Sequence, residues 1–100
     1  MLKITRIVKR PDPNIKWFHE TVTPVFLEYL NEKYIKSEKL TKTRTYDETG
    51  NIQTNVLIWV NDEAFEEFKN DPILTLIVDQ RRTYEANNQF EIISQDIEII

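Results

Sequence analysis

The chain has 100 residues, of which 40% are hydrophobic and 30% are charged, and its formal net charge is −4 at pH 7. This balance predicts one globular domain over residues 1–100 and argues against a nucleic-acid-binding protein, which needs a clustered basic surface. The absence of Cys, the single Gly and the single His exclude disulfides, thiolate or His-rich metal sites and Gly-rich phosphate loops, so we expect no metal and no organic cofactor.

The first elements are a strand and a helix. LKITRIVKR (2–10) predicts a strand that ends at RPDPN, because proline fixes φ and removes a hydrogen-bond donor. From about Asn14, a plausible N-cap, apolar residues recur at helical spacing as far as Tyr34. Pro24 lies inside this pattern and is expected to kink the helix or divide it at Thr23.

A hairpin follows. LTKTRTY (40–46) and NIQTNVLIWV (51–60) predict two strands, and Gly50 between them supplies the positive φ that a tight turn requires. Asn61 or Asp62 then caps a helix that begins DEAFEEF.

The second helical region is expected to restart or kink at Asn70-Asp71-Pro72, with Asp71 as N-cap, and to continue to about Ala86. FEIISQDIEII (90–100) predicts the last strand. The order β-α-β-β-α-β is that of the ferredoxin-like α+β fold, in which a four-stranded antiparallel sheet carries two helices on one face.

The run NVLIWV (55–60) raises the question of what covers the second face of this sheet. We place Ile52, Val56 and Ile58 under the helices, which leaves Leu57 and Trp59 on the open face. A Leu and a Trp side by side on a bare sheet favour a homodimer whose sheets pack face to face. The alternative is a thick core with a few exposed hydrophobic residues.

The element order, WVNDEAFEEF leading into the second helix, and the continuation DPILTLI resemble the dimeric α+β-barrel superfamily, which includes antibiotic-biosynthesis-monooxygenase-like and stress-responsive barrel proteins. The resemblance covers nearly the whole chain. It implies a homodimer, often with a cavity between sheet and helices. Its monooxygenase-like branch works without metal or flavin; the Asn, Trp and His typical of its haem-degrading relatives are not found at the corresponding places here.

His19 is the one side chain whose ordinary pKa lies near neutrality, so it is the candidate catalytic base. The alternative is a surface or half-buried helix residue. A second candidate site is a polar cluster on the hairpin. With Arg44 opposite Gln53 and Lys42 opposite Asn55, these side chains share the open face with Trp59.

Arg44, Asn55 and Trp59 are therefore the candidate ligand-binding residues, for a small anionic or aromatic molecule. The alternative is a polar rim of the dimer interface. No apolar run reaches the length of a signal peptide or a membrane span, which predicts a cytoplasmic protein without membrane contact. Two functions stay open: a dimeric small-molecule-binding protein, or a cofactor-independent monooxygenase-like or isomerase-like enzyme.

Overall fold

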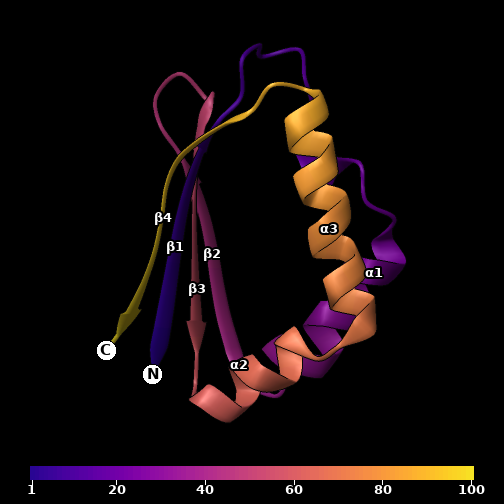
Figure 1. Cartoon of the computed structure of the whole chain (residues 1–100), viewed down its shortest axis with the longest axis vertical. Coiled ribbons are helices and arrows are strands. Elements are labelled where there is room, and N and C mark those ends of the chain that lie inside the picture. The colour runs from indigo at the N-terminus through magenta and orange to yellow at the C-terminus, as the bar shows by residue number, and fades with distance from the viewer.

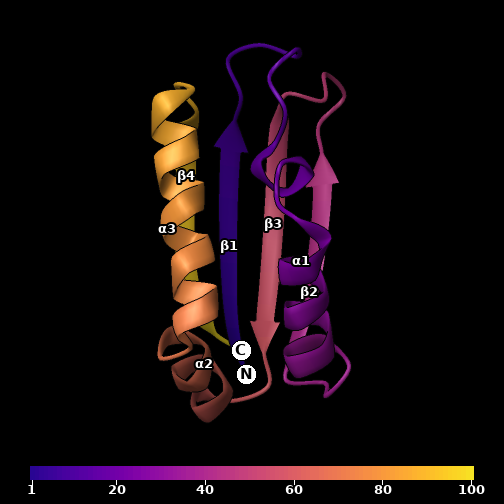
Figure 2. The same cartoon turned by 90° about the vertical axis from the view of Figure 1, so that its right-hand side faces the viewer.

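The computed structural model describes all 100 residues and has a four-stranded antiparallel sheet with its helices on one face (Figure 1). The strands lie in the order β2-β3-β1-β4. In chain order, the elements are β1 (Leu2–Lys9), the 3-10 turn η1 (Phe18–Glu20), α1 (Pro24–Leu30), the π-helical turn η2 (Asn31–Ile35), β2 (Leu40–Tyr46), β3 (Ile52–Trp59), α2 (Asp62–Lys69), α3 (Pro72–Asn87) and β4 (Glu91–Ile99). In Figure 2, α1 lies over β2 and α3 lies over β4. The predicted α+β class is confirmed, with three α-helices in place of two.

The connection from β1 to α1 differs from its prediction. Residues 14–17 are not helical, and Asn14 caps no helix, because its backbone N–H donates to Asp12 Oδ1 at 2.8 Å in a local turn. The expected division at Thr23 is confirmed, since Thr23 is the N-cap of α1 and Pro24 occupies its first turn.

Trp17 explains why this connection leaves the helical path. Its side chain is buried, packs edge-on against Phe90 with ring centroids 5.5 Å apart, and also meets Tyr46 at 5.8 Å. The Arg10 guanidinium lies over the same ring at 5.0 Å. These contacts anchor the loop to the end of the sheet, so burial of one large aromatic side chain outweighs the helical spacing of its neighbours.

The hairpin of β2 and β3 has the predicted elements but a different register. Arg44 pairs with Asn55 and Lys42 pairs with Leu57, each two residues away from its predicted partner. Asp47 and Ile52 are joined by a backbone hydrogen bond of 3.0 Å, and Gly50 adopts φ 75° in the turn. A shift of two residues leaves the same side chains on each face of the sheet.

Both predicted helix caps in the second half of the chain are confirmed. Asn61 Oδ1 accepts a hydrogen bond of 2.8 Å from the backbone N–H of Ala64 at the start of α2. Asp71 Oδ1 accepts one of 3.0 Å from the N–H of Ile73 at the start of α3. Each carboxyl or amide oxygen satisfies a helical N–H that has no partner within its own helix.

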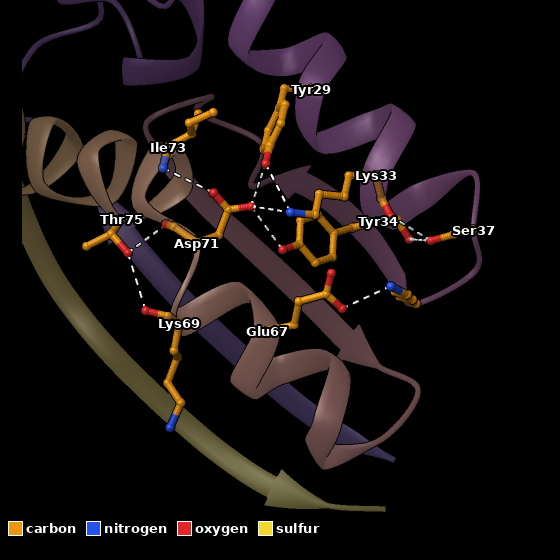
Figure 3. A network of polar contacts seen from close by, with 10 residues as sticks. Tyr29, Lys33, Tyr34, Ser37, Glu67, Lys69, Asp71, Ile73 and Thr75 are labelled. Atoms are coloured by element: carbon orange, nitrogen blue, oxygen red, sulfur yellow. Dashed lines mark hydrogen bonds and ion pairs between the residues drawn. The ribbon is translucent and has the colours of Figure 1, made fainter.

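The second oxygen of Asp71 ties α3 to the first helical region (Figure 3). Asp71 Oδ2 accepts hydrogen bonds from the Tyr29 hydroxyl at 2.7 Å, from Lys33 Nζ at 3.0 Å and from the Tyr34 hydroxyl at 3.1 Å. Asp71 and Tyr34 are both buried. Burial by itself would raise the pKa of Asp71, but the hydrogen bonds from Tyr29, Lys33, Ile73 and Tyr34 outweigh it and lower the pKa to about 2.

The core contradicts the predicted assignment of the two sheet faces. Trp59 is fully buried under the helices, with its ring centroid 5.0 Å from that of Phe68 and 5.7 Å from that of Tyr34. Leu57 packs against the same cluster. The physical reason is the size of the Trp side chain. Helix α2 follows β3 directly and places its Phe side chains over the Trp ring. Burial of this ring removes more apolar area from water than burial of the smaller Ile and Val side chains of the other face would.

The open face of the sheet therefore carries the residues that were expected under the helices. On β3 these are Ile52, Thr54, Val56 and Ile58, all of which stay partly exposed. On β1, Ile7 pairs with Thr54 and lies on the same face. The Leu57–Trp59 argument for a dimer is thus wrong, while the dimer itself stays a prediction. No helix combines the length and the apolar character needed to cross a membrane.

We expect Asp71→Asn to destabilise the protein by about 2 kcal/mol at pH 7, because it removes the charge to which three side chains donate. The pKa of Asp71 is lowered from 3.8 to about 2 on folding, so this stabilisation is complete above pH 4 and is lost as the pH falls toward 2. Urea unfolding of wild type and variant at pH 7 and pH 3 measures it.

Asp96→Asn, an exposed substitution on β4, is the matched control and should follow the wild-type curve. Equal free energies of unfolding for wild type and Asp71→Asn at pH 7 would contradict a stabilising role for Asp71.

Candidate functional site

A cavity of about 510 Å³ lies between the sheet and the helices. All four strands, the η1 segment and the three α-helices contribute to its walls. This volume is within the range of small-molecule sites.

One end of the cavity is apolar and aromatic. Leu57 and Trp59 of β3 form its floor, and Phe65, Phe68 and Leu74 cover it from α2 and α3. Trp59 lies 5.0 Å from Phe68 and 5.8 Å from Phe65, measured between ring centroids. We call this group the aromatic end. Its surface is mainly apolar, and the Lys69 ammonium lies 4.9 Å from the centroid of the Phe65 ring.

The middle of the hairpin contributes a ladder of polar side chains. Arg44 Nε donates to Asn55 Oδ1 at 3.1 Å, Asn55 Nδ2 donates to Gln53 Oε1 at 2.8 Å, and Gln53 Nε2 donates to the Tyr46 hydroxyl at 3.2 Å. Arg44 uses only Nε here, so its two Nη groups remain available to a ligand. The ladder holds the guanidinium in place at the wall of the cavity.

Lys42 lies next to this ladder on β2 and makes no ion pair or hydrogen bond in the structure. Burial, together with repulsion from Arg44 and Arg81, lowers the pKa of Lys42 from 10.5 to about 8. A cation in this position reduces the stability of the folded protein, because no protein group compensates for the water that it loses.

Helix α3 brings a second set of charges to the cavity. Arg6 of β1 forms a buried ion pair with Glu85. Arg81 Nε lies 3.8 Å from the same Glu85 carboxylate oxygen and is buried without a hydrogen-bond partner. Burial, and then repulsion from Arg6, lowers the pKa of Arg81 to about 10. One carboxylate thus serves two guanidinium groups.

His19 lines the cavity from η1. Burial and the positive charge of Arg44 lower its pKa, and Glu20 opposes them only in part. The imidazole is therefore neutral at pH 7 and able to accept a proton. No side chain of the protein donates to it or accepts from it within hydrogen-bond distance.

The structure brings the predicted site residues into one cavity but at different depths. His19, Arg44 and Asn55 are together, since the charge of Arg44 acts on His19 and Asn55 bonds to Arg44. Trp59 pairs with Leu40, four residues from Arg44 along β2, which is about 13 Å in an extended strand. Trp59 therefore belongs to the aromatic end and not to the polar cluster.

Their predicted position on the open face is wrong, because Lys42, Arg44, Gln53 and Asn55 point under the helices. Burial of cations is costly, because they lose their water of hydration. The cavity around them reduces that cost without removing it, as the lowered pKa of Lys42 indicates.

Arg81 and Glu85 are functional candidates that sequence reasoning missed. In the sequence, the adjacent pair Arg81-Arg82 is typical of a solvated charged face of a helix. A signal existed, because Leu74, Val78, Arg81 and Glu85 follow each other at intervals of three and four, which places them on one face of a helix.

Comparison with known proteins gives a likeness of fold. The sequence matches no protein-family model, and no curated protein matches it. The structure is similar to that of protein YJCS, solved by structural genomics, with a TM-score of 0.54 at 16% sequence identity over 100% of this chain and 99% of that chain. At this level of identity the similarity concerns the fold alone.

We expect Lys42→Met to stabilise the protein by about 2 kcal/mol at pH 7, because it replaces a half-buried, unpaired cation with an apolar side chain of similar length. The gain should shrink as the pH rises from 8 toward 10.5. In that window the folded wild type has lost the Lys42 proton that the unfolded chain still binds, so wild-type stability increases with pH.

Thermal unfolding between pH 7 and pH 10 measures this difference. Lys9→Met, at an exposed position of β1, should change the free energy of unfolding by less than about 0.5 kcal/mol. A loss of stability in Lys42→Met would show that Lys42 has a stabilising partner.

Proposed function

We propose that the protein binds a small organic molecule in the cavity between its sheet and its helices. The observation that carries this proposal is a cavity of about 510 Å³ whose wall combines the aromatic end with Lys42, which has no protein partner, and Arg81, whose Nε has no hydrogen-bond acceptor. Binding sites typically join a mostly apolar surface to a few oriented polar groups. Unpaired buried charges reduce stability, and such a cost is common where function needs them.

The proposal includes a homodimer of ferredoxin-like protomers related to the dimeric α+β barrels. The element order and the strand order β2-β3-β1-β4 support the ferredoxin-like part. The open face supports the dimer, because Ile7, Val56 and Ile58 form a partly exposed apolar strip along the central strands. A second sheet packed on this strip would bury it.

Native mass spectrometry of protein purified without denaturation tests the assembly, and a dimer is expected. A monomer at micromolar concentration would contradict the dimer while leaving the cavity as it is.

Fluorescence titration with N-phenyl-1-naphthylamine, an uncharged aromatic probe, tests the cavity. We expect binding to wild type and a Kd increased about tenfold or more in Val78→Trp, because the larger side chain fills the cavity that Val78 lines. Val25→Trp makes the same change at a position of α1 that is 69% exposed and should bind as wild type does. Equal binding by both variants would place the probe elsewhere and contradict the proposal.

A second function, a cofactor-independent oxygenase, is favoured by one observation. His19 is a neutral base beside Arg44 in the same cavity, and an electron-rich substrate that loses a proton can react with oxygen by itself. Dithranol, which oxidises slowly in solution, is a suitable probe in an oxygen electrode.

For this second function, wild type should accelerate oxygen uptake and His19→Gln should not, while both bind N-phenyl-1-naphthylamine equally. Absence of acceleration by wild type would leave binding as the function of the cavity.

A further inference from the structure

We infer that the ligand is an organic carboxylate, and that its charged group lies between Lys42 on β2 and Arg81 on α3. This inference rests on the proposed function and specifies the chemical class of the ligand. It follows from a charge balance that the protein leaves incomplete inside its own cavity.

The charge balance begins with Glu85, which is buried in the wall of the cavity. Its carboxylate is paired with Arg6, and Arg81 reaches it only at 3.8 Å. The Nε of Arg81 is buried and has no hydrogen-bond partner. A buried guanidinium donor without an acceptor is costly, so an acceptor supplied by a ligand would be stabilising.

Lys42 faces the same space from the sheet. Lys42, Arg44 and Arg81 line the same cavity, the positive charges of the two Arg residues act on Lys42, and Lys42 has no partner of its own. Arg44 contributes two free Nη groups, because only its Nε bonds to Asn55. An anion bound beside these cations would offset their mutual repulsion, which the folded protein retains when no ligand is bound.

The surroundings favour a singly charged carboxylate over a phosphate dianion. Phosphate sites commonly use backbone N–H groups at helix N-termini. Here every donor is a side chain, and Arg81 and Glu85 belong to the C-terminal half of α3 (Pro72–Asn87), where the helix dipole disfavours added negative charge. Glu85 itself also repels a dianion more strongly than a monoanion.

The apolar body of the ligand has room on one side of these charges. Lys42 pairs with Leu57 on β3, and Leu57 begins the aromatic end of the cavity. Leu74 and Val78 lie on the face of α3 that carries Arg81. A flat or extended hydrocarbon attached to the carboxylate would contact these side chains and remain within the cavity.

Isothermal titration with three matched probes tests the inference: 1-naphthaleneacetate, its uncharged amide 1-naphthaleneacetamide, and 1-naphthyl phosphate. Wild type should bind the carboxylate about tenfold or more tightly than the amide, as expected for charge-assisted hydrogen bonds. The carboxylate should also bind more tightly than the phosphate. Equal affinity for carboxylate and amide would overturn the inference while leaving the proposed function intact, and so would preference for the phosphate.

Variants locate the charged group. Lys42→Met and Arg81→Met should each reduce the preference for carboxylate over amide to about threefold or less, with little change in the affinity for the amide. Lys9→Met removes the same charge at an exposed position and should keep the wild-type preference. If Arg81→Met does not fold, Arg81→Gln replaces it in this test, because Gln retains hydrogen-bond donors for Glu85. Retention of the full preference in both cavity variants would overturn the placement between β2 and α3.

Discussion

The carboxylate of Asp71 is the interaction on which the rest of this structure depends. It caps α3 with one oxygen and holds Tyr29, Lys33 and Tyr34 with the other. The start of α3 is thereby tied to the first helical region, and its Leu74 packs in the core beside Trp59. This arrangement lets α3 pass over the sheet with a cavity beneath it, where close packing would otherwise bring helix and sheet into full contact.

The far end of α3 is held by different contacts. The Tyr84 hydroxyl donates to the backbone carbonyl of Lys16, and Glu85 pairs with Arg6 of β1. The helix is thus fixed at both ends while its middle borders the cavity. Val78 is therefore oriented by contacts several residues away. The cavity thus results from how the helix is anchored, and positions such as Val78 can be varied without loss of those anchors.

The sequence predicted the elements well where local chemistry decides them. Asn61 and Asp71 cap helices as expected, Pro24 begins a helix, and Gly50 allows the hairpin turn. The helix predicted from Asn14 does not form there, because the burial of Trp17 depends on a long-range contact that local spacing does not encode. The order of the elements along the chain followed from these local signals.

The faces of the sheet could not be assigned from the strand alone. Both faces of β3 are apolar along NVLIWV, so alternation gave no preference, and the decision depends on the Phe side chains that α2 places over Trp59. The grouping of Arg44, Asn55 and Trp59 on one face was nevertheless predictable, since it needs only the two-residue period of a strand. Whether that face lies under the helices or on the open side of the sheet depends on tertiary contacts.

The two tryptophans can serve as intrinsic fluorescent probes of the cavity. Trp59 lies at the aromatic end, enclosed by Phe65 and Phe68, while Trp17 lies near the opposite end of β2, where Tyr46 and the Arg10 guanidinium meet its ring. The indoles are both buried, yet one sits in a hydrocarbon environment and the other beside a positive charge. Because these environments differ, we expect the two indoles to emit at different wavelengths, so that the intrinsic fluorescence of the folded chain reports on each end of the cavity without any added label.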